Sequence, residues 1–111
     1  MQSITRSALE GILAAIVREV QPEQVILFGS LARGEPTAAS DVDLMVIEDE
    51  AFGKGRSRRR EMSRIREALW EFRVPLDILV FSRGEVEQWL NCSSHLIGRA
   101  LREGVILYAR R

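Results

Sequence analysis

The chain has 111 residues, 46% of them hydrophobic, and its 16 basic residues balance its 16 acidic ones. This length suits one domain, and this hydrophobic content is typical of a folded core rather than of a disordered chain. A net charge of zero excludes the general basic character of a duplex-binding protein, although a local basic surface remains compatible with it.

Hydrophobic periodicity divides the chain into helices and strands. Apolar residues three and four positions apart indicate helices, and short apolar runs bounded by turn residues indicate strands. These patterns predict, in chain order, a helix over 9–20, a strand over 25–28, a brief helix over 31–34, a strand over 41–47, a helix over 56–72, a strand over 74–81, helices over 82–90 and 94–102, and a strand over 105–108.

Local signals place the ends of some of these helices. Ser7 with Glu10, and Ser82 with Glu85, have the spacing of a capping box. Pro22 ends the first helix because its ring cannot continue the helical hydrogen bonds. The order of the elements predicts an α/β (α+β) fold: a small mixed β-sheet with helices packed on one side.

Three aspartates lie on two of the expected strands. Asp41 and Asp43 are two positions apart, so their side chains point to the same face, roughly 6.5 Å apart along the strand. Asp77 interrupts the apolar run 76–81. Because an unpaired charge in a buried strand costs several kcal/mol, a compensating ligand is expected, and oxygen ligands suit a hard divalent cation such as Mg²⁺. The alternative for each aspartate is a solvated residue at a strand end or edge.

A second candidate site follows the strand 25–28. Gly29 allows the backbone to approach a ligand closely, the amides that open a helix bind anions, and Ser30 adds a hydroxyl donor. Arg33 lies one turn further on. This geometry suits a triphosphate, whereas the alternative is an ordinary turn with a serine cap.

Together these residues form one pattern with a defined spacing. The segments Phe28-Gly29-Ser30-Leu31-Ala32-Arg33-Gly34 and Ser40-Asp41-Val42-Asp43-Leu44, followed by Asp77 on a later strand, closely resemble the signature of the DNA polymerase β-like nucleotidyltransferases. The chain is most similar to their minimal (MNT) branch. The resemblance extends over residues 25–81, and the closing segment 103–108 also has the character of that branch.

The resemblance implies a role for each residue of a single nucleotidyltransferase domain over residues 1–111. Gly29 and Ser30 would hold the β- and γ-phosphates of ATP or another nucleoside triphosphate. Asp41 and Asp43 would ligate two Mg²⁺ ions. Asp77 would ligate the catalytic ion and help to deprotonate the acceptor hydroxyl. Arg33 has two interpretations, a phosphate contact or a structural salt bridge.

The resemblance also implies a partner protein. Proteins of the MNT branch, which this chain resembles, are encoded with a small helical HEPN protein. The two form a toxin–antitoxin pair in which the MNT protein adenylylates a tyrosine of the HEPN ribonuclease. We therefore expect an adenylyltransferase that acts as an antitoxin. Two alternatives stay open: a nucleotide-binding antitoxin that acts by occlusion, and half of an antibiotic-type nucleotidyltransferase.

Several other features have less specific interpretations. The basic stretch 54–66 predicts either a solvated helix face or a contact with RNA, triphosphate or an acidic partner. Cys92 and His95 are too isolated for a metal site. Trp70 and Trp89 suit the core or an interface, and with Tyr108 they are the best candidates for partner anchors.

Three observations suggest a cytoplasmic location. Cys92 is the only cysteine, so the chain has no internal disulfide, as is usual in a reducing cytosol. The longest apolar run, 12–17, is too short to cross a bilayer. Residues 1–6 lack the layout of a signal peptide.

Overall fold

A four-stranded sheet organises the chain. The computed structural model describes residues 5–29, 31–34 and 42–110. Its strands are β1 (Gln24–Phe28), β2 (Val42–Glu48), β3 (Leu76–Ser82) and β4 (Val105–Ala109). Their order across the sheet is β3-β2-β1-β4, with β2 and β3 parallel and the other neighbours antiparallel. The predicted mixed sheet is therefore confirmed.

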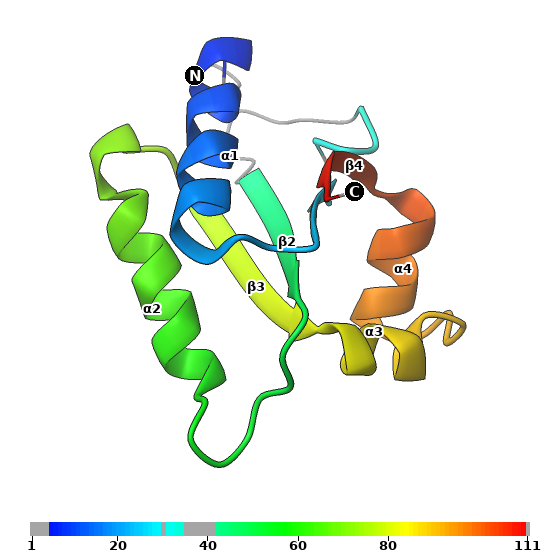
Figure 1. Ribbon diagram of the computed structural model, residues 1–111. Coiled ribbons are helices and arrows are strands. Elements are labelled where there is room, and N and C mark those ends of the chain that lie inside the picture. Colours follow the sequence, from blue (N-terminus) through cyan, green and yellow to red (C-terminus); the bar gives the residue numbers. More distant parts are fainter. Residues whose placement is uncertain (1–4, 30, 35–41, 111) are drawn as a thin grey trace.

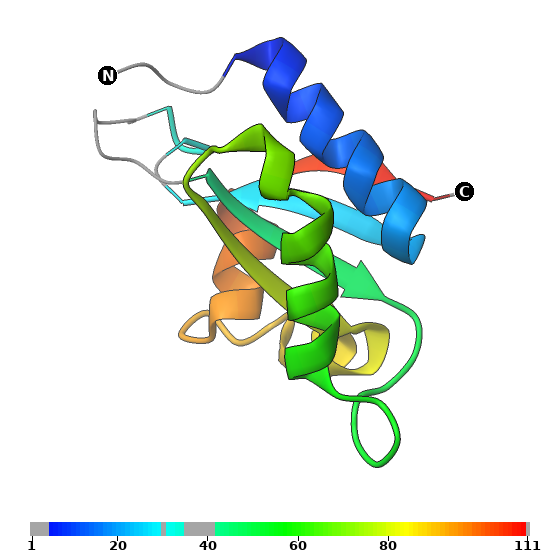
Figure 2. The same ribbon diagram turned by 90° about the vertical axis from the view of Figure 1, so that its left-hand side faces the viewer.

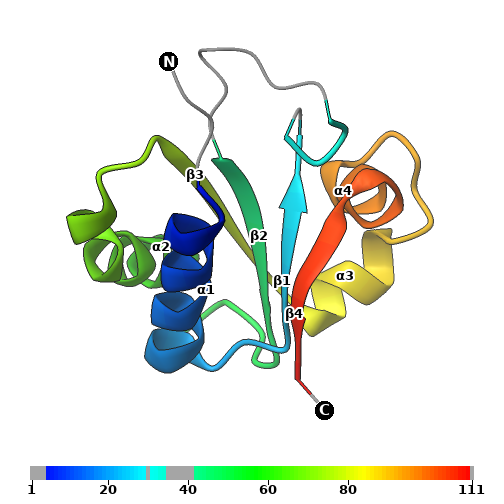
Figure 3. The same ribbon diagram turned by 90° about the horizontal axis from the view of Figure 1, so that it is seen from above.

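Helices cover both faces of this sheet. Helices α1 (Arg6–Val20) and α2 (Arg58–Ala68) lie on one face, and α3 (Arg83–Trp89) and α4 (Leu96–Glu103) lie on the other (Figure 3). The predicted packing of helices on one side was wrong. The reason is the apolar run of β2: Leu44 and Val46 join the core under α1 and α2, whereas Met45 and Ile47 join the core under α4. A strand that is apolar at consecutive positions needs cover on both faces.

The first helix begins two residues earlier than its capping signal predicted. Thr5 is the N-cap, and its hydroxyl accepts a hydrogen bond of 3.0 Å from the backbone N–H of Ala8. The proposed capping box of Ser7 and Glu10 was wrong, because Ser7 already lies inside the helix. The helix ends at Val20, before Pro22, as predicted.

The second long helix is shorter than predicted and ends in a separate turn. α2 stops at Ala68, and a 3₁₀ turn, η1 (Trp70–Phe72), follows it. Leu69 is buried in the core and Phe72 packs against it, which ends the regular helix by turning the chain toward β3. Figure 2 shows α2 running along β3, so that η1 lies where β3 begins.

The remaining elements follow the predicted order. Ser82 and Glu85 form the predicted capping box at the start of α3. α4 leads through Gly104 into β4, which pairs with β1. Within the described ranges, no helix is both long and apolar enough to cross a membrane.

Candidate functional site

The candidate site lies at one end of the sheet. β1 runs antiparallel to β2, and β2 runs parallel to β3, so the end of β1 meets the starts of β2 and β3 (Figure 3). Gly29 follows the last residue of β1, whereas Asp43 and Asp77 are each the second residue of their strand. The topology thus brings together residues from three separate segments. We call this end of the sheet, where the candidate catalytic residues lie, the catalytic edge.

Asp43 and Asp77 are direct neighbours across the two parallel strands. They are paired in register, and both lie on the face of the sheet that carries Met45 and Phe81, which is the face covered by α3 and α4. Two carboxylates placed side by side in this way repel each other, and a divalent cation would relieve the repulsion. The pairing therefore supports the predicted grouping of these two residues.

The burial predicted for Asp77 was wrong. Asp43 is half-buried, but Asp77 is exposed, because it stands at the start of β3 rather than in its middle. Water can solvate its carboxylate, so this charge does not need a bound cation to compensate for burial. Its role in metal binding is supported instead by its position beside Asp43 on the same face of the sheet.

Gly29 is required by the close approach of the chain to Asp43. Its φ of 79° lies in the left-handed region, which favours glycine. A Cβ at this position would overlap Oδ2 of Asp43 and lie 3.1 Å from its Cγ. The backbone of the turn after β1 therefore lies directly against the carboxylate that was predicted to bind metal.

The segment after Gly29 is a turn rather than the predicted brief helix. The Arg33 N–H donates to the Gly29 carbonyl at 3.2 Å, and the Gly34 N–H donates to the Leu31 carbonyl at 3.3 Å. One turn of this kind orders the chain without forming a helix. Ser30 and Asp41, which were predicted to bind phosphate and metal, lie outside the described residues.

Arg33 makes an ion pair with α4. Its Nη1 lies 3.8 Å from Oε1 of Glu103, and both side chains are partly exposed. The contact supports the structural interpretation of Arg33, because it joins the turn after β1 to the end of α4. Partial exposure also leaves the guanidinium in reach of solvent, where such a pair contributes little to stability.

The residues that the structure describes contain no complete metal site. Within residues 5–29, 31–34 and 42–110, no group of three histidine, cysteine or acidic side chains could hold a metal ion. Asp43 and Asp77 supply two hard oxygen donors in neighbouring positions, which fit one side of a Mg²⁺ shell. The third donor predicted from the sequence, Asp41, is outside those ranges.

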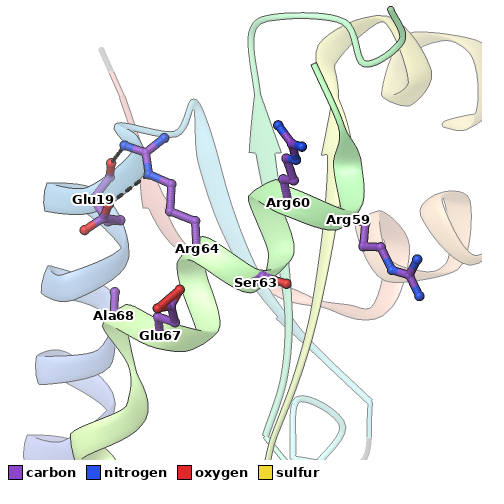
Figure 4. Close-up of a pocket in the computed structure, with 7 residues that line it drawn as sticks. All are labelled: Glu19, Arg59, Arg60, Ser63, Arg64, Glu67 and Ala68. Atoms are coloured by element: carbon purple, nitrogen blue, oxygen red, sulfur yellow. Dashed lines mark hydrogen bonds and ion pairs between the residues drawn. The ribbon is translucent and has the colours of Figure 1, made fainter. Parts of the chain in front are cut away.

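Ion pairs inside the molecule account for part of the basic stretch 54–66. Arg58 pairs with Glu85 and donates to the carbonyl of Val80 at 2.7 Å, which ties the start of α2 to β3 and α3. Arg64 donates to Oε2 of Glu19 at 2.8 Å. Figure 4 shows this arginine turned toward α1. These contacts are structural.

The same stretch lines a groove between α1 and α2. The groove has a volume of about 660 Å³ and is lined by Glu19, Arg59, Arg60, Ser63, Arg64, Glu67 and Ala68 (Figure 4). It lies beside the end of α1, where β1 begins, so it is at the opposite end of the sheet from Gly29. Its arginines are therefore remote from the catalytic edge.

A buried carboxyl group at the end of β2 was not predicted from the sequence. Glu48 is 5% exposed, and its Oε1 lies 2.5 Å from Nη2 of Arg56. Burial raises the pKa of Glu48 to about 8, with a further increase from Glu61 and an opposing decrease from Arg56. The only signal in the sequence was an acidic residue directly after four apolar positions, 44–47, which equally suits a strand ending in solvent.

The sequence of the chain matches a known domain family. The family described as "Nucleotidyltransferase domain" matches residues 9–106, which include Gly29, Asp43 and Asp77. The chain belongs to the nucleotidyltransferase domain family. Enzymes of this family generally use a nucleoside triphosphate and Mg²⁺. No curated protein has a sequence significantly similar to this chain.

Solved structures agree with this assignment. A chain provisionally named a minimal nucleotidyltransferase is 32% identical, with a TM-score of 0.59, over 90% of this chain and 89% of that one. A chain from Sulfolobus solfataricus, provisionally named a nucleotidyltransferase, is 23% identical, with a TM-score of 0.51, over 99% of this chain and 94% of its own. A toxin–antitoxin structure with AMP-PNP is 19% identical, with a TM-score of 0.54, over 92% and 74%. The last two show the fold alone.

Proposed function

We propose that this nucleotidyltransferase domain transfers AMP from ATP to a hydroxyl group of a partner protein, as the antitoxin of a HEPN ribonuclease. The observation that carries the proposal is the pairing of Asp43 with Asp77 beside the Gly29 turn. A phosphate-binding turn next to paired carboxylates is the arrangement that nucleotidyl transfer needs.

Each residue at the catalytic edge has a role in the proposed reaction. Gly29 and Ser30 bind the β- and γ-phosphates through the backbone and a hydroxyl group. Asp41, Asp43 and Asp77 would hold two Mg²⁺ ions, which supply charge neutralisation at the phosphates. Asp77 is exposed, so its carboxylate is accessible to an incoming acceptor and can accept the proton of its hydroxyl.

The proposed step is an in-line displacement at the α-phosphorus. The acceptor oxygen forms a bond to that phosphorus, and the bond to the β-phosphate oxygen breaks. Pyrophosphate leaves, and the hydroxyl proton passes to the carboxylate of Asp77. Positioning of the acceptor contributes several kcal/mol to such a reaction, so the surface that holds the acceptor is part of the catalytic apparatus.

Two findings support a protein acceptor. One structural neighbour is a toxin–antitoxin structure with AMP-PNP, which joins this fold to a nucleotide analogue and a protein pair. In addition, Asp77 is exposed on an edge strand of the sheet, where a large partner can reach it. Modification of a tyrosine on the partner would add negative charge and bulk, which oppose RNA binding.

The test is transfer to a HEPN-type protein, the proposed acceptor. After co-expression, we expect intact-mass measurement to show one or more added AMP groups on the partner. Asp43→Asn should remove them while leaving the melting temperature of the metal-free protein unchanged or raised, because clustered like charges destabilise a fold. Asp49→Asn, the same change at an exposed site beyond the other end of β2, should keep the modification.

The outcomes separate the three candidate functions. An unmodified partner that Asp43→Asn still neutralises would show occlusion instead of transfer. A domain that binds no helical partner but labels a small hydroxyl compound with ATP would show the antibiotic-type function. A large loss of melting temperature in Asp43→Asn would show that this aspartate is structural.

A further inference from the structure

Trp70 is the most exposed large apolar side chain in the described part of the molecule. Its exposed fraction is 77%, compared with 57% for Ile106, the next in order. The geometry of η1 explains this exposure. In a 3₁₀ turn, residues three apart point to the same side, and the core takes Leu69 and Phe72. Trp70 consequently faces outward, and the fold gains nothing from its indole.

Two hollows adjoin this indole. The first has a volume of about 290 Å³ and is lined by Arg66, Leu69, Trp70, Arg73, Val74 and Leu76; we call these residues the Trp70 surface. The second, of about 450 Å³, is lined by Arg66, Glu67 and Trp70. Trp70 and Arg66 belong to both hollows. The protein thus offers a prominent aromatic side chain next to concave surface, as is common at the centres of protein interfaces.

The charge of the first hollow has one sign. Its lining contains two guanidinium groups, from Arg66 and Arg73, and no carboxylate. Within the described ranges, neither arginine forms an ion pair. The other four lining residues are apolar. A partner that fits this hollow therefore presents an apolar side chain flanked by carboxylates, which would pair with the two arginines as they lose water.

The Trp70 surface adjoins the catalytic edge. Leu76 lines the hollow, and the next residue is Asp77. The two side chains project to opposite faces of β3, which is an edge strand of the sheet. A protein that straddles the start of β3 can therefore contact both. Figure 1 shows η1 at the end of α2 where β3 begins.

The other exposed apolar side chains lie elsewhere. Val105 and Ile106 belong to β4, which forms the opposite edge of the sheet from β3. β1 and β2 stand between β4 and the strand that carries Asp77. A protein bound along β4 would therefore leave the start of β3 open. The Trp70 surface is the exposed apolar site that adjoins Asp77.

We propose that the Trp70 surface is the docking site of the acceptor protein, which inserts an apolar side chain flanked by aspartate or glutamate into the hollow beside Trp70. This inference rests on the proposed function, because it assigns the acceptor of that reaction to a surface. Docking there holds the partner beside Asp77, so that a hydroxyl group of the partner can reach the α-phosphate. Trp70 acts as a positioning residue and takes no part in the chemical step.

The experiment measures binding of a HEPN-type protein, the proposed acceptor, to this domain. Trp70→Ala should weaken binding at least about tenfold, the loss typical of an aromatic anchor. Its melting temperature and its affinity for ATP with Mg²⁺ should stay as in the wild type, because the indole is exposed. Leu90→Ala, which also truncates an exposed apolar side chain, should bind the partner normally.

Charge reversal tests the predicted acidity of the partner. Arg66→Glu should weaken binding, and the salt dependence of the remaining binding should be shallower than that of the wild type. Arg60→Glu is the matched control, because it makes the same change at an exposed position near the start of α2. Loss of binding in both variants would indicate a general electrostatic attraction and would overturn the assignment to this hollow.

The outcomes distinguish the docking site from the proposed function. AMP transfer that persists with wild-type partner affinity in Trp70→Ala would overturn the docking site and leave the function standing. A wild-type domain that binds ATP with Mg²⁺ but neither binds nor modifies the partner would overturn both. Loss of partner binding in Trp70→Ala and Arg66→Glu, with normal ATP binding, is the result that supports the proposal.

Discussion

Gly29 joins two functions in one residue. Its positive φ allows the chain to reverse after β1, and its missing side chain allows the backbone to reach the carboxylate of Asp43. Either requirement alone would favour glycine. Gly34 shares only the first, because its φ is 73° and nothing lies within 4 Å of the position a Cβ would take. Comparing substitutions at the two glycines therefore distinguishes the effect of backbone strain from the effect of contact with Asp43.

We predict that Gly29→Ala impairs nucleotide binding, whereas Gly34→Ala does not. Both substitutions place a Cβ in the left-handed region and should lower the free energy of unfolding by roughly 1–2 kcal/mol. Only the change at Gly29 displaces Asp43, so ATP affinity with Mg²⁺ should fall by an order of magnitude or more in that variant alone. Urea unfolding and calorimetry measure the two effects, and equal ATP affinity in both variants would contradict the role of Gly29.

Residue types and spacing predicted the candidate site better than burial did. Gly29, Asp43 and Asp77 were identified because their types match phosphate and metal chemistry, and the topology brings them to one edge. The burial of Asp77 could not be read from its apolar neighbours, since a strand's exposed first residues look the same in sequence as its buried ones. Glu48 was missed for the converse reason, because its apolar neighbours do not reveal the contacts that it makes with Arg56 and Glu61.

At the scale of elements, a buried carboxyl group joins the end of β2 to the segment that leads into α2. Glu48 pairs with Arg56, which also lies 3.6 Å from Glu61 of α2. The second oxygen of Glu48, Oε2, is buried and has no hydrogen-bond partner among the residues that the structure describes. A carboxylate in this position would be costly, and a protonated, neutral carboxyl group is less so. This explains why burial raises the pKa of Glu48 to about 8.

This contact should make the stability of the fold depend on pH. The unfolded chain releases the Glu48 proton near pH 4.5, and the folded chain keeps it until about pH 8. The free energy of unfolding should therefore fall as pH rises between these values, by at most about 1.4 kcal/mol per pH unit from this group. Glu48→Gln, which is neutral at every pH, should flatten this dependence in urea unfolding at pH 5 to 8.

The control for this prediction is an exposed glutamate nearby. Glu50→Gln changes the same chemical group two residues further along, where the side chain is exposed, and should keep the pH dependence of the wild type. A Glu48→Gln variant whose stability falls with pH as steeply as that of the wild type would show that another group is responsible.

Element positions followed from periodicity, but element ends and the layers of the fold did not. The helix predicted over 56–72 is α2 followed by η1, because burial of Leu69 and Phe72 overrides the helical pattern. Both helices of the second layer were predicted, over 82–90 and 94–102, but their place on the opposite face of the sheet was not. The apolar run of β2 contained the necessary information, since such a run requires cover on both faces.

At the scale of the whole molecule, the acidic and basic residues balance, so any attraction of a triphosphate to the catalytic edge has to come from charges near that edge. The chain carries no net charge at pH 7, so its net charge does not attract a polyanion. The groove lined by Arg59, Arg60 and Arg64 lies at the far end of the sheet from Gly29. At the catalytic edge itself, Asp43 and Asp77 are adjacent, and the described cation of the Gly29 turn, Arg33, is paired with Glu103.

We therefore predict that the domain binds ATP only in the presence of a divalent cation. Two carboxylates beside a triphosphate repel it, and a bound cation converts that repulsion into attraction. Calorimetry should show ATP affinity falling at least about tenfold, or about 1.4 kcal/mol, when EDTA replaces Mg²⁺. Asp43→Asn should change ATP affinity in opposite directions in the two conditions. In EDTA the variant should bind ATP more tightly than the wild type does, because it lacks one repelling charge. With Mg²⁺ it should bind ATP less tightly, because it lacks one metal ligand. Equal ATP affinity of the wild type with and without Mg²⁺ would show that these carboxylates do not form a metal site, because a cation bound between them and the phosphates would have to raise the affinity.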